Sequence, residues 1–242
     1  EARSAGVLLT VFQNRRWDGD FLTVRDLLDR GVLGAPLRFE SRFERWRPAA
    51  PAGWKNEGDP EDATGLLYDL GSHLIDQALQ LFGPVAMVYA EEDRRRPGTH
   101  VVDDAYVALT HVSGVRAHLH VSSIVAEPAA RFRVLGSDAT FTKFGLDVQE
   151  AASREGARPG QSGWGEEPRE RWGRLARGSE TSVVETKRGA YERYYAGIAA
   201  ALRGEAPPPV LPEEAVAGLE IIEAAMRSAA EGRVVEPGPA TR

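Results

Sequence analysis

Five stretches between residues 85 and 144 have the pattern of β-strands, and they constrain the fold more than any other feature of the sequence. The stretches are residues 85–91, 103–111, 114–125, 130–135 and 140–144. Several connections between them are short and contain glycine, as between Val112 and Val115, and such connections are typical of antiparallel hairpins. Residues 36–46 add another stretch in which apolar and charged side chains alternate. The pattern predicts an open, mainly antiparallel sheet.

Helices are expected to cover one face of this sheet, so the expected fold class is α+β. Residues 64–83 carry apolar side chains at three- and four-residue spacing. Residues 20–30 and 212–231 are each followed directly by glycine, a common helix stop. Residues 189–202 form a tyrosine-rich helix whose rings are expected to pack against the sheet. Residues 145–179 are rich in turn formers and charges and are expected to have little regular structure.

The start of the chain predicts a different kind of sheet. Residues 7–12 form a continuous apolar run, which is typical of a strand covered on both faces, as in a parallel sheet. A parallel strand needs neighbours that are reached through crossover helices, and the sequence offers none before this run. We therefore interpret residues 1–18 as a remnant of another α/β domain, and residues 19–242 as a second domain that includes the C-terminal helix.

Composition and charge exclude several classes of function. The net charge of −6 and the lack of a long basic run give no electrostatic reason to expect nucleic acid. The absence of cysteine excludes disulfides, thiolate nucleophiles and cysteine-ligated metals. No apolar run approaches the length of a membrane span and no signal peptide is apparent, so a cytoplasmic protein without membrane contact is expected. His111, His118 and His120 lack an acidic partner at suitable spacing, so no metal site is predicted.

Three polar residues on the helix at residues 64–83 are the main candidates for chemistry. Asp69, His73 and Asp76 lie at i, i+4 and i+7, so they share one face beside the apolar stripe. Charged groups in such a place are costly to bury unless they are paired or used. A histidine can exchange a proton near neutral pH, and a carboxylate one turn earlier can orient its ring. A structural Asp–His pair is the alternative, and spacing alone favours that interpretation.

Two other segments carry candidate ligand contacts. Asn14, Arg15 and Arg16 directly follow the predicted strand at residues 7–12, and ligands of open α/β sheets bind beyond the carboxyl ends of strands. The alternative is a helix entry with solvated arginines. The long loop after residue 46 contains Trp54 and Lys55, which are either ligand contacts or a packed indole with a surface lysine.

Together these segments resemble the Gfo/Idh/MocA family of oxidoreductases, named after glucose–fructose oxidoreductase, inositol dehydrogenase and rhizopine catabolism. The resemblance is greatest to the NADP-dependent scyllo-inositol 2-dehydrogenase-like branch. It is carried by residues 11–24 (VFQNRRWDGDFLTV), 67–79 (LYDLGSHLIDQAL) and 143–150 (KFGLDVQE). It implies that residues 1–18 contain the last strand of an otherwise missing dinucleotide-binding (Rossmann) domain, and that the second domain binds substrate and forms oligomers through its sheet.

The resemblance also implies roles for single residues. His73 is the expected acid/base group on the substrate hydroxyl, and Asp69 is expected to bind or orient. The expected substrate-binding residues are Asn14, Arg15, Arg16, Asp76, Lys143, Asp147 and Gln149, and the expected cofactor-binding residues are Trp54 and Lys55. The implied cofactor is NAD or NADP, with NADP favoured, and the implied substrate is a polyol or sugar similar to inositol.

Three departures from the family pattern limit what this chain is expected to do alone. No G-x-G-x-x-G turn and no Glu-Lys-Pro segment occur in the sequence, and the Gly-Gly-Gly that often precedes the helix is here Ala63-Thr64-Gly65. We therefore expect the substrate-binding and oligomerisation portion of an NAD(P)-dependent oxidoreductase that acts on a CH–OH group, inactive by itself and without tight NAD(P) binding. The alternatives are a non-catalytic homodimerisation module that kept the family fold, and a sugar-binding protein without chemistry.

Overall fold

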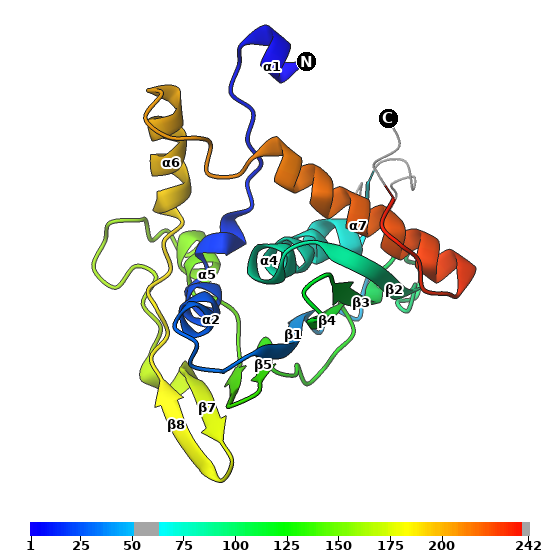
Figure 1. Cartoon of the computed structure of the whole chain (residues 1–242), viewed down its shortest axis with the longest axis horizontal. Helices are drawn as coiled ribbons and strands as arrows, with labels where there is room; N and C mark the ends of the chain where they lie inside the picture. The colour runs from blue at the N-terminus through cyan, green and yellow to red at the C-terminus, as the bar shows by residue number, and fades with distance from the viewer. Residues whose placement is uncertain (51–62, 239–242) are drawn as a thin grey trace.

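The computed structural model describes residues 1–50 and 63–238, and one mixed, open sheet forms the centre of this part of the chain (Figure 1). The strand order is β2-β3-β4-β1-β5-β6-β7-β8. The strands are β1 (Pro36–Glu44), β2 (Val85–Asp93), β3 (Asp104–His111), β4 (Arg116–Ser122), β5 (Phe132–Gly136), β6 (Thr140–Lys143), β7 (Gly173–Arg177) and β8 (Glu180–Val184). Each neighbouring pair is antiparallel except β1 and β4, which are parallel. The expected open, mainly antiparallel sheet is confirmed, whereas the parallel pair was not foreseen.

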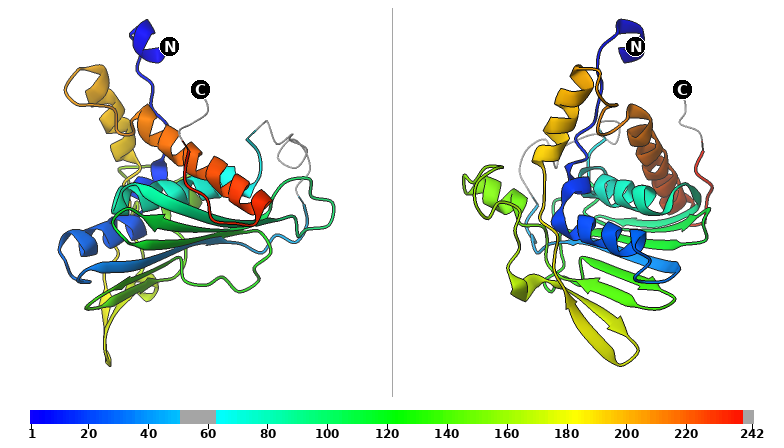
Figure 2. Two further views of the ribbon diagram at one scale, coloured as in Figure 1. Left: turned by 45° about the vertical axis from the view of Figure 1, so that its right-hand side comes forward. Right: turned by 60° about the vertical axis from the view of Figure 1, so that its left-hand side comes forward.

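Three helices cover one face of the sheet and leave the other face open (Figure 2). They are α2 (Gly19–Asp29), α4 (Ser72–Phe82) and α7 (Pro212–Glu231). α7 is fastened to the sheet edge because the Ala90 amide of β2 donates to the Ser228 hydroxyl of α7 at 3.0 Å. Other helical elements lie around this layer: α1 (Ala2–Ala5), η1 (Asn14–Trp17), η3 (Leu67–Gly71), α5 (Gln149–Arg154), η4 (Arg169–Arg171) and α6 (Glu192–Leu202).

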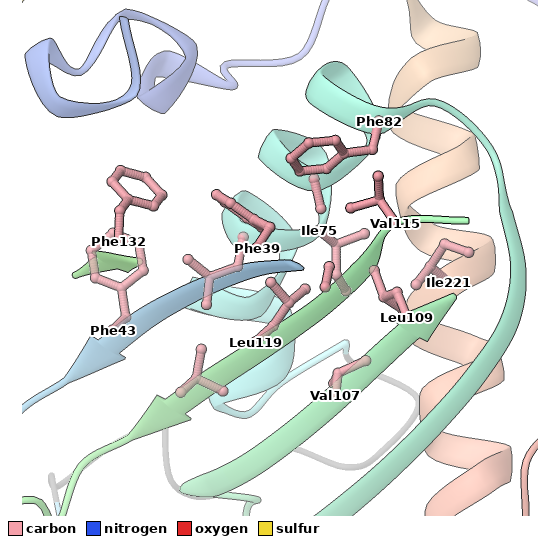
Figure 3. Packing of buried hydrophobic residues seen from close by; sticks show 14 of the residues in the cluster. Phe39, Phe43, Ile75, Phe82, Val107, Leu109, Val115, Leu119, Phe132 and Ile221 are labelled. Atoms are coloured by element: carbon pink, nitrogen blue, oxygen red, sulfur yellow. The ribbon is translucent and has the colours of Figure 1, made fainter. Parts of the chain in front are cut away.

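The core lies between this helix layer and the central strands, and alternate residues of β1, β3 and β4 point into it (Figure 3). The ring of Phe39 on β1 lies 5.3 Å from that of Phe82 on α4 and 5.6 Å from that of Phe132 on β5. All three rings are nearly or fully buried. Burying such a side chain stabilises the fold by about 1.5–3 kcal/mol, so this aromatic contact fixes α4 over the middle of the sheet.

The helix expected at residues 64–83 begins with a π-helical turn, η3, and continues as α4. A Cβ on Gly71 would lie 2.6 Å from Cδ1 of Leu67, so a larger residue at this position would require the Leu67 side chain to move. Ala63, which stands where the family pattern often has glycine, takes a left-handed backbone with φ 51°. That conformation costs an L-residue roughly 1–2 kcal/mol.

The expectation of a strand at residues 7–12 is wrong for this structure. The segment has no strand hydrogen-bond ladder in the part of the chain that the structure describes, and it stands away from the sheet (Figure 1). Val7 is 60% exposed and Phe12 is 46% exposed. The physical reason is that an extended segment without a hydrogen-bonded neighbour does not form a stable strand.

Two further expectations are corrected. Residues 145–179 contain α5, η4 and β7, because β7 continues the sheet beyond β6. The tyrosines of α6 do not pack against the sheet: Tyr194 contacts Phe12 at 4.9 Å and Trp17 at 5.7 Å between ring centroids. Residues 7–12, an exposed apolar arm, and η1 therefore provide the surface against which the tyrosine-rich helix packs.

Candidate functional site

His73 lies in the first turn of α4, and its ring is fixed by one hydrogen bond. Its Nδ1 lies 2.8 Å from Oε1 of Gln13, the residue before η1. An amide oxygen only accepts hydrogen bonds, so Nδ1 carries the proton and Nε2 keeps its lone pair. Within residues 1–50 and 63–238, the hydrogen bond of the His73 ring is the one at Nδ1, and none is found at Nε2. The ring is thus prepared to accept a proton at Nε2.

The surroundings of His73 favour its neutral form. Burial lowers the pKa of His73 to about 4, and the nearby Arg15 and Arg131 cations act in the same direction, while Glu150 opposes them. A histidine with such a pKa is neutral at pH 7. His73 is therefore a base at physiological pH and holds no proton to donate until it has accepted one.

Arg131 is the more deeply buried of the two arginines, and sequence reasoning missed it. Its Nη1 donates to Ser41 Oγ at 2.5 Å and its Nη2 donates to Gln77 Oε1 at 2.9 Å. Its guanidinium also lies 4.3 Å from the ring centroid of Phe43. Burial lowers the pKa of Arg131 to about 10, partly offset by nearby carboxylates, so it stays positively charged at neutral pH. Position 131 directly precedes a strand and carries no motif, so no signal in the sequence marked it.

Arg15 completes this cationic surrounding from η1. It donates from Nη2 to Glu150 of α5 at 2.5 Å and forms a longer contact with Asp18 at 3.4 Å. Its guanidinium lies 4.7 Å from the ring centroid of Phe43, the same ring that Arg131 contacts. Only 6% of Arg15 is exposed. The alternative of solvated arginines is wrong, because carboxylates and an aromatic ring take the place of water.

Arg16 and Asp76, both expected to bind substrate, bind each other. Nε and Nη2 of Arg16 donate to the two carboxylate oxygens of Asp76 at 2.8 and 2.6 Å, and Nη1 donates to Glu214 of α7 at 3.0 Å. The Arg16 and Asp76 side chains are 7% and 5% exposed. A two-point pair of this kind is specific in geometry. It joins η1 to α4 and α7, so we leave both residues out of the proposed site.

Asp69 lies apart from His73 in its contacts. No hydrogen bond or ion pair joins the two side chains in the described part of the chain, and Gln13 holds the ring instead. Asp69 is exposed and lines a cavity of about 320 Å³ at the start of η3. The cavity is also lined by Arg45, Arg47, Ala49, Ala63, Thr64, Gly65, Leu66, Tyr68, Arg96, Val101, Val102 and Ser123.

Lys143 occupies a structural position. Its ammonium group donates to Glu167 at 2.9 Å and to the Phe144 carbonyl at 2.5 Å, and the residue is fully buried. A buried ammonium with these partners has no surface left for a ligand, so we leave Lys143 out of the proposed site.

Asp147 and Gln149 support the start of α2. Asp147 Oδ2 accepts from the Gly19 amide at 2.7 Å, and Gln149 donates from Nε2 to the Trp17 carbonyl at 3.1 Å. Gln149 Oε1 also accepts from the Tyr191 amide at 2.9 Å. Burial raises the pKa of Asp147 to about 6, and neighbouring Asp20 adds to this effect. These contacts position the segment that carries Gln13.

The remaining expected site residues are less constrained. Asn14 is half-buried in η1, and its side chain makes no hydrogen bond within residues 1–50 and 63–238. Its amide is therefore free to meet a ligand. Trp54 and Lys55, the expected cofactor contacts, lie outside the described residues.

The histidines that could suggest a metal site lie on opposite faces of the sheet. His111 is buried on the helix-covered face beside Phe82, whereas His118 and His120 lie on the open face, where both contact Tyr106. The described residues contain no group of three or more His, Cys, Asp or Glu side chains placed to hold a metal ion. No described helix is long and apolar enough to cross a membrane.

Comparison with known proteins identifies the family. The family model described as the oxidoreductase family's C-terminal alpha/beta domain, of Gfo/Idh/MocA type, matches residues 25–236. The chain belongs to the Gfo/Idh/MocA oxidoreductase family. The resemblance found in the sequence is thereby confirmed.

Relatives of this Gfo/Idh/MocA chain cover nearly all of it. Scyllo-inositol 2-dehydrogenase (NADP(+)) IolW of Bacillus subtilis (strain 168) is 40% identical over 97% of this chain and 66% of its own length. YdgJ, an uncharacterized oxidoreductase of Escherichia coli (strain K12), is 41% identical over 94% of this chain and 66% of its own length. The solved structure of yvaA from Bacillus subtilis superposes with a TM-score of 0.90 at 40% identity, covering 97% of this chain and 67% of that one. The chain thus spans 66% of the length of these two curated relatives.

The printed sequence of this Gfo/Idh/MocA chain lacks the glycine-rich turn of the Rossmann dinucleotide site. The sheet of the described residues contains one parallel pair, β1 with β4, and the printed sequence contains no G-x-G-x-x-G turn. A dinucleotide's pyrophosphate needs such a turn at the start of a helix in a parallel α/β unit. The chemistry that can be derived from these residues is therefore that of the substrate proton.

Proposed function

We propose that this chain is the substrate-binding portion of an NAD(P)-dependent oxidoreductase that acts on a CH–OH group of a polyol or sugar. The observation that carries the proposal is the state of His73. Its Nδ1–H is held by Gln13, its Nε2 has no hydrogen bond to the part of the chain that the structure describes, and burial beside Arg15 and Arg131 keeps it neutral. A neutral imidazole with one free nitrogen is a general base. Membership of an oxidoreductase family supplies the reaction type.

In this role His73 accepts the proton of the substrate hydroxyl, and the cofactor accepts the hydride from carbon. The substrate O–H bond breaks and its proton passes to Nε2, while the C–H bond breaks with its electron pair and a carbonyl forms. A bound nicotinamide supplies the acceptor for that hydride. The Nδ1 hydrogen bond to Gln13 Oε1 keeps Nε2 as the accepting atom. Arg15 and Arg131 hold the ring unprotonated until the transfer.

The cofactor is proposed to be NAD or NADP, with NADP favoured by the printed name of the relative IolW. Most of its binding domain is proposed to lie outside the described residues, and residues 1–18 are proposed to be the part of that domain that they include. Val7, Leu9 and Phe12 support this proposal because they expose apolar surface with 60%, 50% and 46% accessibility. Exposed apolar surface of this kind marks a contact with another domain or chain.

Oligomerisation through the open sheet face is the second part of the proposal. This face carries an ionic grid in which Arg42 pairs with Glu40 at 3.1 Å and Arg133 pairs with Glu40 at 3.0 Å. Beside the grid, the rings of Tyr106 and His120 lie 4.7 Å apart. A broad face with fixed charges and aromatic rings suits a homodimer or a higher homo-oligomer. A cytoplasmic location stays a prediction from the sequence.

Hydride transfer is the reaction that tests this function. The assay follows reduction of NADP or NAD with scyllo-inositol and related polyols, using this chain joined to a dinucleotide-binding domain of the family. His73→Gln is expected to lower kcat by about 10²–10⁴-fold, as removal of a general base does. Glu180→Gln, at the exposed start of the edge strand β8, is the control and should retain activity.

The chain of 242 residues by itself is expected to show neither hydride transfer nor tight NAD(P) binding. Full activity of His73→Gln in the joined protein would overturn the role of His73. Absence of hydride transfer from any polyol, with a stable oligomer, would favour the alternative of a non-catalytic homodimerisation module.

A further inference from the structure

The cavity beside Asp69 is unusual in its charge. Three of its described lining side chains are arginines, Arg45, Arg47 and Arg96, and Asp69 is the one acid among them. Arg96 is already neutralised, since its Nε donates to Asp103 at 2.7 Å and the pair is buried. Arg45 and Arg47 make no side-chain hydrogen bond or ion pair within the described residues. The described lining of the cavity therefore includes two arginines without a paired carboxylate, the half-buried Arg45 and the exposed Arg47, and one carboxylate.

The backbone fixes the two uncommitted arginines on the same side of one extended segment. Just beyond the end of β1, the Arg45 amide donates to the Ser122 carbonyl at 2.9 Å and the Arg47 amide donates to the Ser123 carbonyl at 2.7 Å. Residues two apart on an extended segment point to the same side, and Trp46 between them is 58% exposed on the other side. Arg96 reinforces this geometry because its Nη1 donates to the Arg47 carbonyl at 3.4 Å. The backbone that carries the two arginines is thus positioned independently of any ligand.

The electrostatic surroundings of Arg45 do not compensate for its burial. Burial lowers the pKa of Arg45, and the neighbouring Arg47 and Arg15 cations lower it further, while Glu150 and Asp69 act in the opposite direction. Arg16, by contrast, has two carboxylates within 3.0 Å and a raised pKa despite its burial. A partly buried arginine among other cations is destabilised unless an anion joins it.

The volume of the cavity limits the ligand. Pockets for small ligands typically measure about 300–1,000 Å³, so a cavity of about 320 Å³ suits a single sugar or polyol and excludes a dinucleotide. Asp69 can accept hydrogen bonds from hydroxyl groups, and guanidinium groups match carboxylate and phosphate oxygens in pairs.

We propose that Arg45 and Arg47 bind an anionic group, a carboxylate or a phosphate, on the sugar or polyol substrate, with Asp69 accepting hydrogen bonds from its hydroxyls. This inference rests on the proposed function, and it makes the substrate an acidic sugar or a sugar phosphate in place of a neutral inositol. Arg45 and Arg47 are then the residues that determine specificity.

Direct binding to the 242-residue chain tests the inference without a cofactor. The probes are D-glucuronate, D-glucose 6-phosphate and inorganic phosphate, with D-glucose and scyllo-inositol as neutral counterparts, measured by calorimetry. An anionic sugar is expected to bind about 10- to 100-fold more tightly than its neutral counterpart, the range that charge-assisted hydrogen bonds supply. The comparison of glucuronate with glucose 6-phosphate distinguishes the two anions.

The variant Arg45→Gln with Arg47→Gln should abolish this preference. Arg174→Gln is the matched control, since Arg174 is an exposed arginine on β7 and is not among the residues that line the cavity. Equal binding of glucuronate and glucose would overturn the inference. So would a preference that survives in the double variant, or no binding of any anion at about 10 mM, a concentration that would nearly saturate a site with a Kd of about 1 mM.

Failure of this inference is separable from failure of the proposed function. If the joined protein oxidises neutral polyols through His73 and the double variant does so equally well, the anion site is wrong and the dehydrogenase stands. If anions bind through Arg45 and Arg47 but no polyol is oxidised, the anion site stands and the dehydrogenase is wrong.

Discussion

His73 and Asp76 lie three positions apart at the start of α4, and the fold treats their charges in opposite ways. Asp76 is 4% exposed and both its oxygens are occupied by Arg16. His73 meets cations that suppress its protonation, and its Nε2 is left without a partner. A fully paired charge holds structure together, whereas an unpaired base beside cations costs stability and is available for chemistry.

The titration of His73 is the most direct check on this assignment. We expect NMR titration of the imidazole signals to give His73 a pKa of about 4, because burial and the neighbouring Arg15 and Arg131 disfavour its cation. The His73→Gln spectrum identifies the signal. A midpoint at or above the ordinary value of about 6.5 would contradict the description of His73 as a base that is neutral at pH 7.

The pair between Arg16 and Asp76 should be essential to stability. Asp76→Asn leaves Arg16 buried with Glu214 alone, and we expect it to lower the free energy of unfolding by about 3 kcal/mol, in the range for breaking a buried ion pair. Urea denaturation measures the loss. Glu213→Gln is the control, because it breaks a pair with Arg3 whose side chains are 91% and 62% exposed. Such a surface pair contributes at most about 1 kcal/mol, and similar losses in the two variants would contradict this account.

The sequence allowed His73 to be proposed, but it did not allow its surroundings to be predicted. The spacing of Asp69, His73 and Asp76 is local information that a helix period reveals. Gln13 lies 60 positions from His73, and Arg131 lies 54 positions from the Gln77 that holds it. No periodic pattern relates such pairs. The sequence therefore could not show that Gln13, and not Asp69, is the hydrogen-bond partner of the His73 ring.

Secondary-structure elements show the same division between local and distant information. α7 begins at Pro212 and ends at Glu231, as predicted, because its start and stop residues lie within its own sequence. The parallel pairing of β1 with β4 joins Arg38 to Arg116, and nothing in either strand encodes its partner. β8 (Glu180–Val184) was missed because its residues are largely exposed and show little alternation.

Two glycine substitutions should affect their elements in opposite directions. A Cβ on Gly173 of β7 would lie 2.3 Å from the Phe141 ring of β6, so Gly173→Ala should lower stability by about 1–3 kcal/mol through overpacking. A Cβ on Gly218 of α7 meets nothing within 4 Å, so Gly218→Ala should raise stability by about 0.5–1 kcal/mol. Thermal and urea unfolding measure both effects. Equal effects of the two variants would show that neither glycine is set by its surroundings.

The described part of the molecule contains a well-packed core and an exposed apolar segment at residues 7–12. Phe39, Ile75 and Leu109 belong to a core whose members are nearly or fully buried. The arm that carries Val7 and Phe12 stands outside this core and rests on α6 through Phe12 and Tyr194. Val7, Leu8, Leu9, Val11 and Phe12 are all exposed within six consecutive residues, and this concentration is the physical basis for proposing that another domain meets the chain there.

Two partly buried groups, His120 and Asp147, change the free energy of unfolding in opposite directions as the pH falls. One variant can separate their contributions. Burial, with Arg42 and His118 nearby, lowers the pKa of His120 to about 4. The unfolded chain therefore takes up this proton first, and the stability contributed by neutral His120 is complete above about pH 6.5 and is lost as the pH falls to about 4. Asp147 acts in the opposite direction, because its pKa is raised to about 6 in the fold.

The difference between wild type and His120→Gln isolates the first of these contributions. Between pH 7 and pH 4 the wild type should lose about 1–2 kcal/mol more stability than the variant, less than the full linkage value because solvent screens this partly exposed ring. Urea unfolding at a series of pH values gives both curves, and Asp147 contributes equally to each. Parallel curves would mean that His120 titrates alike in the folded and unfolded chains, so that the open sheet face does not keep its imidazole neutral.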